Sequence, residues 1–353
     1  MSVYINGTGC ISPQLSTDGG LFSGLIKEYE DEYLKCTDPD YKLYIPPTMA
    51  RRAGRIIKMG AAAAKICLQD AGVEMPGAVI TGTGMGCIED TENFLTEIIR
   101  NEEKMLAPTA FIQSTHNTAG AQIAILLSCN NYNMTYVHRG FSFESALIDS
   151  MIQINQGEAE NILAGGLDEM TPGMFTISRR LGIYRNTCKG HSALLTEKAP
   201  GSTAGEGVAF FLLDHLKSPS TYCRLEAVEI LYKPKDEEEI TGKIYQILDN
   251  CSLNIEDIDL VISGINGDDR FDGIYSKVLA PFEKSRLAYY KHLCGEYHTS
   301  TAFALWLSAL ILKNNKIPPF LMIKGDNSLT PKNILIYNHY LGSNHSFILL
   351  RKC

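Results

Sequence analysis

Two hydrophobic patterns alternate along this chain. Short apolar runs predict buried strands, and longer stretches with apolar residues three or four positions apart predict helices. In the first half, we expect strands near Val3, Ala78, Met134, Asn161 and Gly207, and helices over 53–71, 90–100, 119–128 and 143–156. In the second half, we expect strands near Cys223, Leu260, Leu287, Ile334 and Ser346, and helices over 237–251, 273–279 and 300–313. This alternation predicts an α/β fold with mainly parallel sheets buried between helical layers.

The segment from Asn133 to Gly166 carries the most specific pattern. A short strand over Met134–His138 leads into the turn Arg139-Gly140, and a helix over Phe143–Gln156 leads through Gly157 to a second buried strand. In such a unit the turn lies at the carboxyl end of the strand, where a helix amino terminus can stabilise negative charge. This order usually positions a nucleophile, yet the turn carries none at Gly140.

Four motifs in this order resemble the β-ketoacyl synthases of the thiolase superfamily. They are VYINGTGCISP near the amino terminus, ITGTGMGCIED, the strand end Ala164-Gly165-Gly166, and AGEGVAFFLLD ending at Asp214. The resemblance implies a thiolase-like fold, in which two duplicated α/β halves form a layered αβαβα arrangement. The halves would span 1–216 and 217–353, with the junction at 217–222. Counted back without gaps from Gly157, the family's catalytic cysteine falls on Gly140.

The resemblance also locates the positions of two catalytic histidines. The family's His-Gly-Thr loop corresponds to the segment after Leu260–Gly264, so Asn266 stands where the first histidine is expected. The family's Lys-x-x-x-Gly-His segment resembles the stretch from Lys291 to His298, and we expect His298 to be the second histidine. The carboxy-terminal Gly-Phe-Gly-Gly turn is replaced by Tyr340–Asn344, which keeps Gly342 but not the gating phenylalanine.

These departures predict that the chain does not condense acyl groups by itself. Claisen condensation needs a thiolate to hold the acyl chain and imidazoles to assist decarboxylation of the malonyl group, and Gly140 has no side chain to acylate. The pattern resembles chain-length-factor subunits, which pair with a cysteine-bearing ketosynthase in fatty acid or polyketide biosynthesis, including aryl-polyene-type pathways. The resemblance implies an acyl carrier protein as a partner and no cofactor.

Two alternatives use the same fold differently. In the first, Ser142 acts as the nucleophile of an acyltransferase, His138 or His298 supplies the base, and backbone amides at Gly140 and Gly342 hold the oxyanion. Against it, a serine just inside a helix start is usually a capping or packing residue. In the second, the protein is a structural homodimer without acyl chemistry. Thiolase-fold proteins generally pair through the strand before the nucleophile turn, here Met134–His138, and this geometry permits either a homodimer or a heterodimer.

Composition narrows the class of protein. The 353 residues are 45% hydrophobic, enough for a large core, and no apolar run is long enough to cross a membrane, so we expect a soluble cytoplasmic protein without a membrane span. The 10 cysteines are scattered without a Cys-x-x-Cys pair, which favours free buried thiols over a metal site.

The net charge of −8 argues against nucleic acid as a partner, because phosphate binding requires a basic face. Basic residues nevertheless gather in two places that could dock an acidic carrier protein. The first group is Arg51, Arg52, Arg55 and Lys58, and the second includes Arg179 and Arg180. Arginines on a helix more often cover a solvated face, particularly in the first group.

Overall fold

A computed structural model describes residues 2–16, 20–29, 31–185, 194, 198–326 and 330–353. Within these residues the strands form one sheet of 11 strands in the order β3-β2-β4-β5-β1-β6-β11-β10-β7-β8-β9. The strands are β1 (Val3–Ile11), β2 (Val79–Gly82), β3 (Asn133–Tyr136), β4 (Asn161–Asp168), β5 (Gly207–Asp214), β6 (Cys223–Tyr232), β7 (Leu260–Ser263), β8 (Arg286–Tyr289), β9 (Met322–Lys324), β10 (Asn333–Tyr340) and β11 (Asn344–Arg351).

The sheet repeats one topology twice, as the resemblance implies. In the order β3-β2-β4-β5-β1 the first two pairings are parallel and the next two antiparallel. The order β8-β7-β10-β11-β6 has the same sequence of pairings. A short antiparallel contact between β1 and β6 joins the two halves, and the proposed junction lies in the connection between β5 and β6.

The expectation of mainly parallel sheets was wrong, because β1, β5, β6 and β11 all pair in antiparallel fashion. A strand buried on both faces reads as the same apolar run in either direction, so the pattern does not encode polarity. The predicted strands and helices are otherwise found within a few residues of their expected positions.

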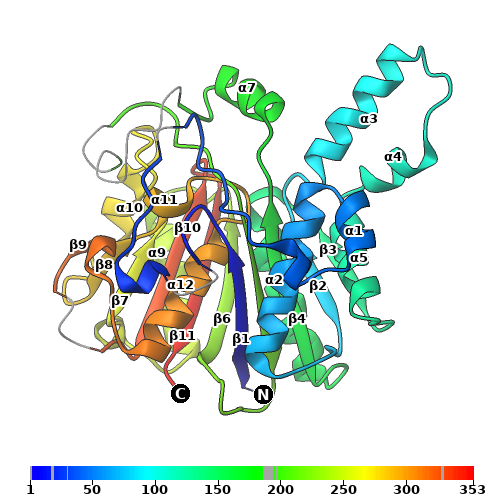
Figure 1. Ribbon diagram of the computed structural model, residues 1–353. Coiled ribbons are helices and arrows are strands. Elements are labelled where there is room, and N and C mark those ends of the chain that lie inside the picture. The colour runs from blue at the N-terminus through cyan, green and yellow to red at the C-terminus, as the bar shows by residue number, and fades with distance from the viewer. Residues whose placement is uncertain (1, 17–19, 30, 186–193, 195–197, 327–329) are drawn as a thin grey trace.

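The longer helices form three layers around the two halves of the sheet (Figure 1). Helices α6 and α12 lie in the middle layer, α2 and α5 cover the outer face of the first half, and α9 and α10 cover that of the second. The α-helices with described bounds are α1 (Pro47–Arg52), α2 (Arg55–Ala71), α3 (Ile88–Arg100), α4 (Pro108–Gln113), α5 (Thr118–Leu126), α6 (Ser142–Gln156), α7 (Pro172–Arg180), α9 (Glu237–Asn250), α10 (Gly273–Val278), α11 (Lys291–Cys294) and α12 (Thr301–Asn314).

The side chains of β4 show how the layers are packed. Ile162 and Ala164 face the core that contains α6 and α12, whereas Leu163 and Leu167 face the core beneath α2. Successive strand residues point to opposite faces, so both faces of this strand are apolar. The five layers therefore have three hydrophobic interiors, and the middle one is the largest.

Glycine fixes the start of α6 against the sheet. A Cβ atom on Gly82, at the end of β2, would lie 2.2 Å from the carbonyl oxygen of Ser142, the first residue of α6. At the other end of the helix, Gly157 adopts φ 76° and caps the carbonyl groups of the last turn. These two contacts set the position of the turn between β3 and α6.

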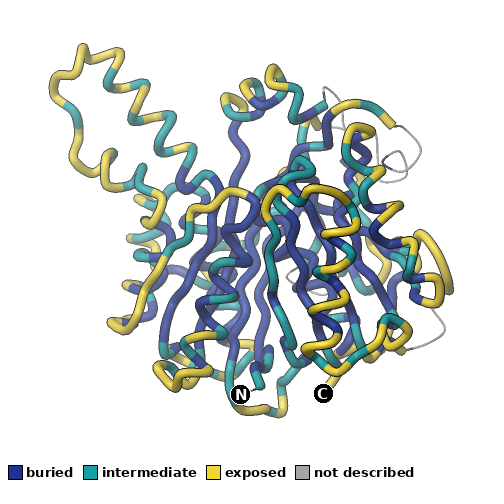
Figure 2. Tube along the Cα trace, turned by 180° about the vertical axis from the view of Figure 1, so that it is seen from behind, coloured by how far each residue is buried: buried dark blue, intermediate teal, exposed yellow. Residues whose placement is uncertain are grey.

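Helices α3 and α4 extend from the body as an arm that lies near β3 and α5 (Figure 1). Figure 2 shows that the arm is exposed over most of its length. Five of its large apolar side chains are exposed, namely Leu95, Ile99, Met105, Phe111 and Ile112.

Candidate functional site

The turn between β3 and α6 is a single 3-10 turn over Arg139–Phe141, and Gly140 is buried within it. A Cβ atom on Gly140 would lie 2.7 Å from the Cβ atom of Tyr340, at the end of β10. The left-handed residue of the turn is Arg139, with φ 50°, and not the glycine beside it. The Cβ atom of Tyr340 thus takes up the space that a side chain would need at position 140, where the missing cysteine is expected.

Ser142 does not face open space. Its side chain is fully buried, and its hydroxyl accepts a hydrogen bond from the His138 backbone N–H at 2.8 Å and donates one to the Arg139 carbonyl at 2.8 Å. These two bonds hold the turn before α6, so Ser142 has a structural role there, although it does not cap the helix. The His138 ring lies near Ser145 instead, at 3.5 Å, so the geometry shows no nucleophile and base pair at Ser142.

Asn266 is buried after β7 and is bonded to Glu296 across the site. Its side-chain amide donates to Glu296 Oε2 at 2.7 Å, and the buried ammonium of Lys291 donates to Glu296 Oε1 and to the Ser300 hydroxyl. Glu296 directly follows Gly295, so an ungapped reading of Lys-x-x-x-Gly-His from Lys291 ends on Glu296. The Glu296 carboxylate is buried and paired with the Lys291 ammonium, so it holds these segments together by charge. A carboxylate of this kind cannot donate a hydrogen bond as an imidazole does.

His298 lies two residues beyond this network. Its ring packs against the Tyr340 ring with the centroids 4.7 Å apart, and its side chain closely approaches Gly84. Burial lowers the pKa of His298, although Asp168 and Glu296 oppose the shift and Arg139 reinforces it. The ring is therefore neutral near pH 7 and packed beneath an aromatic side chain. Tyr340 thus places an aromatic ring at the start of the turn that lacks the family's gating phenylalanine.

Asp168, at the end of β4, joins three segments around the site. One oxygen accepts from Thr83 Oγ1 and from the backbone N–H groups of Gly84 and Met85. The other oxygen accepts from the backbone N–H and hydroxyl of Thr299, just before α12. The family's strand-end carboxylate is thus a structural clamp between β2, β4 and α12.

The amide of Gly342 points into a histidine cluster. Gly342 has φ 62°, and its N–H donates to His339 Nδ1 at 3.4 Å, so the predicted oxyanion donor already has a partner. The His339 ring stacks on Tyr275 with centroids 4.4 Å apart, and burial lowers the pKa of His339 to about 3.

A cavity of about 290 Å³ opens beside these groups. Arg139, His298, Tyr340 and Leu341 line one part of it, and α7 and the segments flanking that helix line the rest. Among the described lining residues there is no cysteine, serine-base pair or metal-binding cluster. The nine described cysteines are free thiols, and Cys188 lies outside the described residues.

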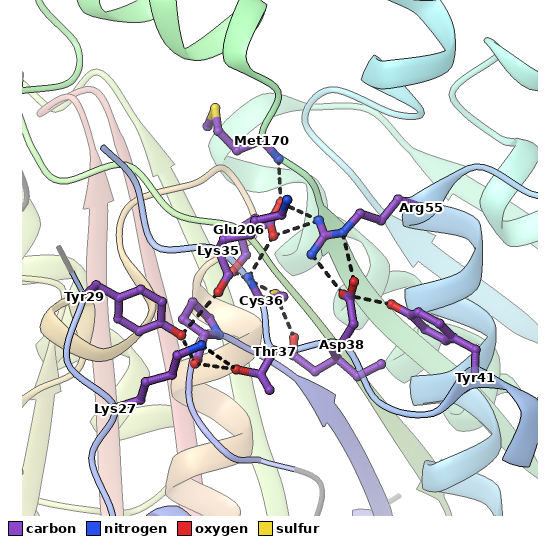
Figure 3. A network of polar contacts seen from close by, with 12 residues as sticks. Lys27, Tyr29, Lys35, Cys36, Thr37, Asp38, Tyr41, Arg55, Met170 and Glu206 are labelled. Carbon is purple, nitrogen blue, oxygen red and sulfur yellow. Dashed lines mark hydrogen bonds and ion pairs between the residues drawn. The ribbon is translucent and has the colours of Figure 1, made fainter. Parts of the chain in front are cut away.

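The first basic group divides into structural and exposed residues. Figure 3 shows Arg55 bridging the Glu206 carboxylate, at 2.7 Å, and Asp38, at 3.0 Å. Glu206 also accepts the backbone N–H groups of Cys36 and Met170. Arg55 therefore ties the segment before α2 to β5 and is not free for docking, whereas Arg51 and Arg52 are exposed.

The second basic group lies on α7, the helix that lines the cavity. Arg180 is exposed, and the Arg179 guanidinium lies 5.9 Å from the centroid of the Phe175 ring. The side chain of Lys58 is half-buried on α2, with its ammonium over the Tyr41 ring.

Residues 5–218, more than half of the chain, match the family described as Beta-ketoacyl synthase, N-terminal domain. The chain belongs to the β-ketoacyl synthase family. No curated protein matches it. Within the described part of this synthase-family chain, no helix is both long enough and apolar enough to span a membrane.

Solved structures show the same fold over the whole length of the β-ketoacyl synthase-like chain. The ishigamide ketosynthase/chain length factor has a TM-score of 0.82 at 18% identity, covering 100% of this chain and 99% of that one. A β-ketoacyl synthase from Burkholderia phymatum STM815 has a TM-score of 0.83 at 16% identity, covering 100% and 99%. A ketosynthase in complex with its chain length factor from Xenorhabdus doucetiae gives 0.80 at 15% identity, covering 100% and 98%. These likenesses confirm the thiolase-like fold.

The sequence analysis assigned no catalytic or binding role to four residues of this site, namely Arg139, Asp168, Glu296 and Tyr340. A signal was present for Glu296, because it is the residue five positions after Lys291 in the family spacing. The family's strand end after Ala164-Gly165-Gly166 continues with one further residue and then an acidic residue, which is Asp168 here. No sequence signal distinguished Arg139 from Gly140 as the left-handed residue, since glycine is the usual occupant of that conformation.

Proposed function

We propose that this β-ketoacyl synthase family protein is a non-condensing partner subunit, similar to a chain length factor, of a cysteine-bearing ketosynthase. The observation that carries the proposal is the closure of the nucleophile position. Gly140 offers nothing to acylate, and Tyr340 occupies the space that a side chain there would need. Read without gaps, the family pattern places Asn266 and Glu296 at its two histidine positions, and these two residues are bonded to each other. Such a site lacks the thiolate and imidazoles of condensation but retains the scaffold around them.

A free edge of the sheet supports a partner. Among the described strands, β3 pairs only with β2, so its other edge is open in the part of the chain that the structure describes. Three apolar side chains near this edge, Ile125, Met134 and Val137, are 69%, 39% and 48% exposed. The α3–α4 arm, which carries further exposed apolar residues, extends from the same side of the body as β3 (Figure 1). Open edges with apolar neighbours are ready to pair with another chain.

The relatives favour a heterodimer over a homodimer. One solved relative is named as a ketosynthase/chain length factor, and another as a ketosynthase in complex with its chain length factor. A third structure is described as a type II acyl-carrier protein in complex with its ketosynthase. By analogy, the partner of this chain would be a ketosynthase of a polyketide or fatty acid pathway. An acyl carrier protein would bind transiently to the heterodimer.

The α7 basic pair is the better candidate for docking the carrier protein. Met174, Ser178 and Leu181 place α7 and its carboxy-terminal end along the cavity. Arg179 and Arg180 therefore stand close to the opening that an acyl chain would use. Charge reversal to Arg179→Glu and Arg180→Glu should weaken carrier-protein binding, whereas Arg51→Glu on α1 should have less effect. Equal losses in both would contradict the assignment to α7.

The function is tested by measuring assembly and acylation separately. The chain would be co-expressed with a cysteine-bearing ketosynthase and analysed by size-exclusion chromatography with light scattering. We expect a heterodimer, which Met134→Lys with Val137→Lys should abolish because charged side chains block an edge strand. Tyr245→Lys, which changes an equally exposed aromatic residue on α9, is the control. A stable homodimer that excludes the ketosynthase would favour the structural alternative.

Acylation is then measured by intact-protein mass spectrometry. The purified chain is incubated with acyl- and malonyl-loaded carrier protein, with Ser142→Ala beside the wild type. We expect no covalent adduct on either protein. An adduct that Ser142→Ala abolishes would establish the acyltransferase alternative.

A further inference from the structure

A short connection leads from β4 into helix α7, and two of its residues are bonded to the α3–α4 arm. The connection runs from Glu169 to Thr171. Glu169 Oε1 accepts the Glu89 backbone N–H at 3.2 Å. The Thr171 hydroxyl donates a hydrogen bond to Glu92 Oε1 at 2.7 Å. Glu89 and Glu92 both lie near the start of α3, and α3 and α7 project from the same side of the body (Figure 1).

Glu92 acts on the residue that caps the amino terminus of α7. The hydroxyl oxygen of Thr171 accepts the Met174 backbone N–H at 3.1 Å, and its proton is donated to Glu92. A Cβ atom on Gly173 would lie 2.7 Å from Glu92 Oε1, so the glycine allows the carboxylate to lie against the first turn of α7. A negative charge at this end of a helix is also favourable. Glu92 therefore fixes the start of α7 through the cap hydroxyl and through its charge.

The face of α3 that holds α7 continues outward as an exposed apolar surface. Residues three, four or seven positions apart share a helix face, so Leu95 and Ile99 lie on the same side of α3 as Glu92. Their side chains are 53% and 79% exposed. Phe94 contacts Phe111 of α4, with the ring centroids 5.7 Å apart, and this contact braces the two helices of the arm. A rigid helix carries a displacement along its length, so a change in the arm reaches Glu92.

We propose that Glu92 is a positioning residue that couples the arm to α7, so that the order of α7 depends on how firmly the arm is held. The link runs from α3 through Glu92 to the Thr171 cap. It concerns the isolated chain. Its consequence for assembly rests on the proposed function, in which a ketosynthase holds this side of the molecule and α7 carries Arg179 and Arg180. A partner on the arm then orders the helix that docks the carrier protein.

The test is hydrogen–deuterium exchange of the peptides that cover α7, measured on the purified chain by mass spectrometry. Glu92→Ala should raise the exchange rate of α7 amides about threefold or more, because loss of a cap weakens a helix start. Glu92→Gln keeps an acceptor for the Thr171 hydroxyl and should retain most of the protection. Glu97→Ala, which changes an exposed glutamate further along α3, is the matched control. Unchanged exchange in Glu92→Ala, or an equal rise in Glu97→Ala, would overturn the proposal.

A double-mutant cycle tests the coupling to the arm itself. Phe111→Ala removes the ring contact with Phe94 and loosens α4 against α3. It should raise the exchange of α7 in the wild-type background and add nothing in the Glu92→Ala background, because the link is already cut there. Equal effects in the two backgrounds, or no effect in either, would contradict transmission through Glu92.

Thermal unfolding separates positioning from folding. Glu92 is half-buried and Phe111 is exposed, so both variants should melt close to the wild-type temperature while α7 exchanges faster. A lower melting temperature with faster exchange throughout the chain would make Glu92 a residue of global stability and overturn its assignment to α7. These measurements need no partner, so their failure is distinct from a failure to form the heterodimer.

Discussion

The side-chain amide of Asn266 donates a 2.7 Å hydrogen bond to Glu296, joining the two positions at which the family pattern, read without gaps, carries its histidines. In a condensing enzyme the groups at these positions must face the substrate. Here they face each other, and the Lys291 ammonium neutralises the other oxygen of the Glu296 carboxylate. The hydrogen-bonding capacity that would serve catalysis is instead used to hold the interior together.

Loss of this bond should destabilise the protein. Asn266→Ala removes a donor to a charged acceptor, for which we expect about 1.5–3 kcal/mol in the free energy of unfolding. Asn266→Asp should cost more near pH 7, because it places a second carboxylate against Glu296. Urea denaturation of both variants measures the difference. If Asn266→Asp were no less stable than Asn266→Ala, the contact with Glu296 would not have the electrostatic character described.

Reinstalling the missing cysteine should not restore condensation. A Cβ atom on Gly140 would meet the Tyr340 Cβ at 2.7 Å, so Gly140→Cys should cost about 1–3 kcal/mol through overpacking. Asn266 would still leave one of the two imidazoles absent. We therefore expect no condensed product when the variant is incubated with acyl- and malonyl-loaded carrier protein.

The steric origin of that cost can be isolated with a double-mutant cycle. The contact is with the Cβ atom of Tyr340, so only Tyr340→Gly removes it, and Tyr340→Phe is the matched control that keeps it. The cost of Gly140→Cys should shrink in the Tyr340→Gly background and persist in the Tyr340→Phe background. Equal costs in the two backgrounds would place the strain elsewhere.

The fold could be predicted further than the site, for a physical reason. Buried strands and helices such as β4 and α6 can be recognised from apolar runs bounded by glycines, and these are local properties of the sequence. Gly140 was likewise found by spacing along one helix. The contacts of Tyr340 with Gly140 and of Asn266 with Glu296 join segments that are far apart in sequence, and no local pattern encodes them. His298 was favoured because imidazole is the expected chemistry, although the spacing from Lys291 pointed to Glu296.

The carboxylate of Glu206 should be important for stability. It accepts bonds from Arg55, from the Cys36 N–H and from the Met170 N–H, and its side chain is fully buried (Figure 3). Glu206→Gln leaves the Arg55 charge without its partner at this end, and we expect a loss of about 3–5 kcal/mol.

The matched control for Glu206 is an exposed ion pair. Glu237 pairs with Lys277 at the surface at 2.7 Å, and Glu237→Gln should change the free energy of unfolding far less than Glu206→Gln does. Both variants can be compared by thermal and urea denaturation. Similar losses for Glu206→Gln and Glu237→Gln would contradict the role of Glu206 as an anchor between the segment before α2 and β5.

Acid should destabilise the protein partly through His339. Burial lowers the pKa of His339 from 6.5 to about 3 in the folded state. Between these two pH values His339 is therefore protonated in the unfolded chain and neutral in the folded protein. The stability held by neutral His339 is therefore complete above about pH 6.5 and is lost as the pH falls from there toward 3, by roughly 2–4 kcal/mol at pH 4. His339→Phe keeps the stacking on Tyr275 but cannot titrate. Its unfolding free energy, measured by urea denaturation from pH 7 to pH 4, should fall less than that of the wild type, and parallel curves for the two proteins would exclude His339 as a source of acid sensitivity.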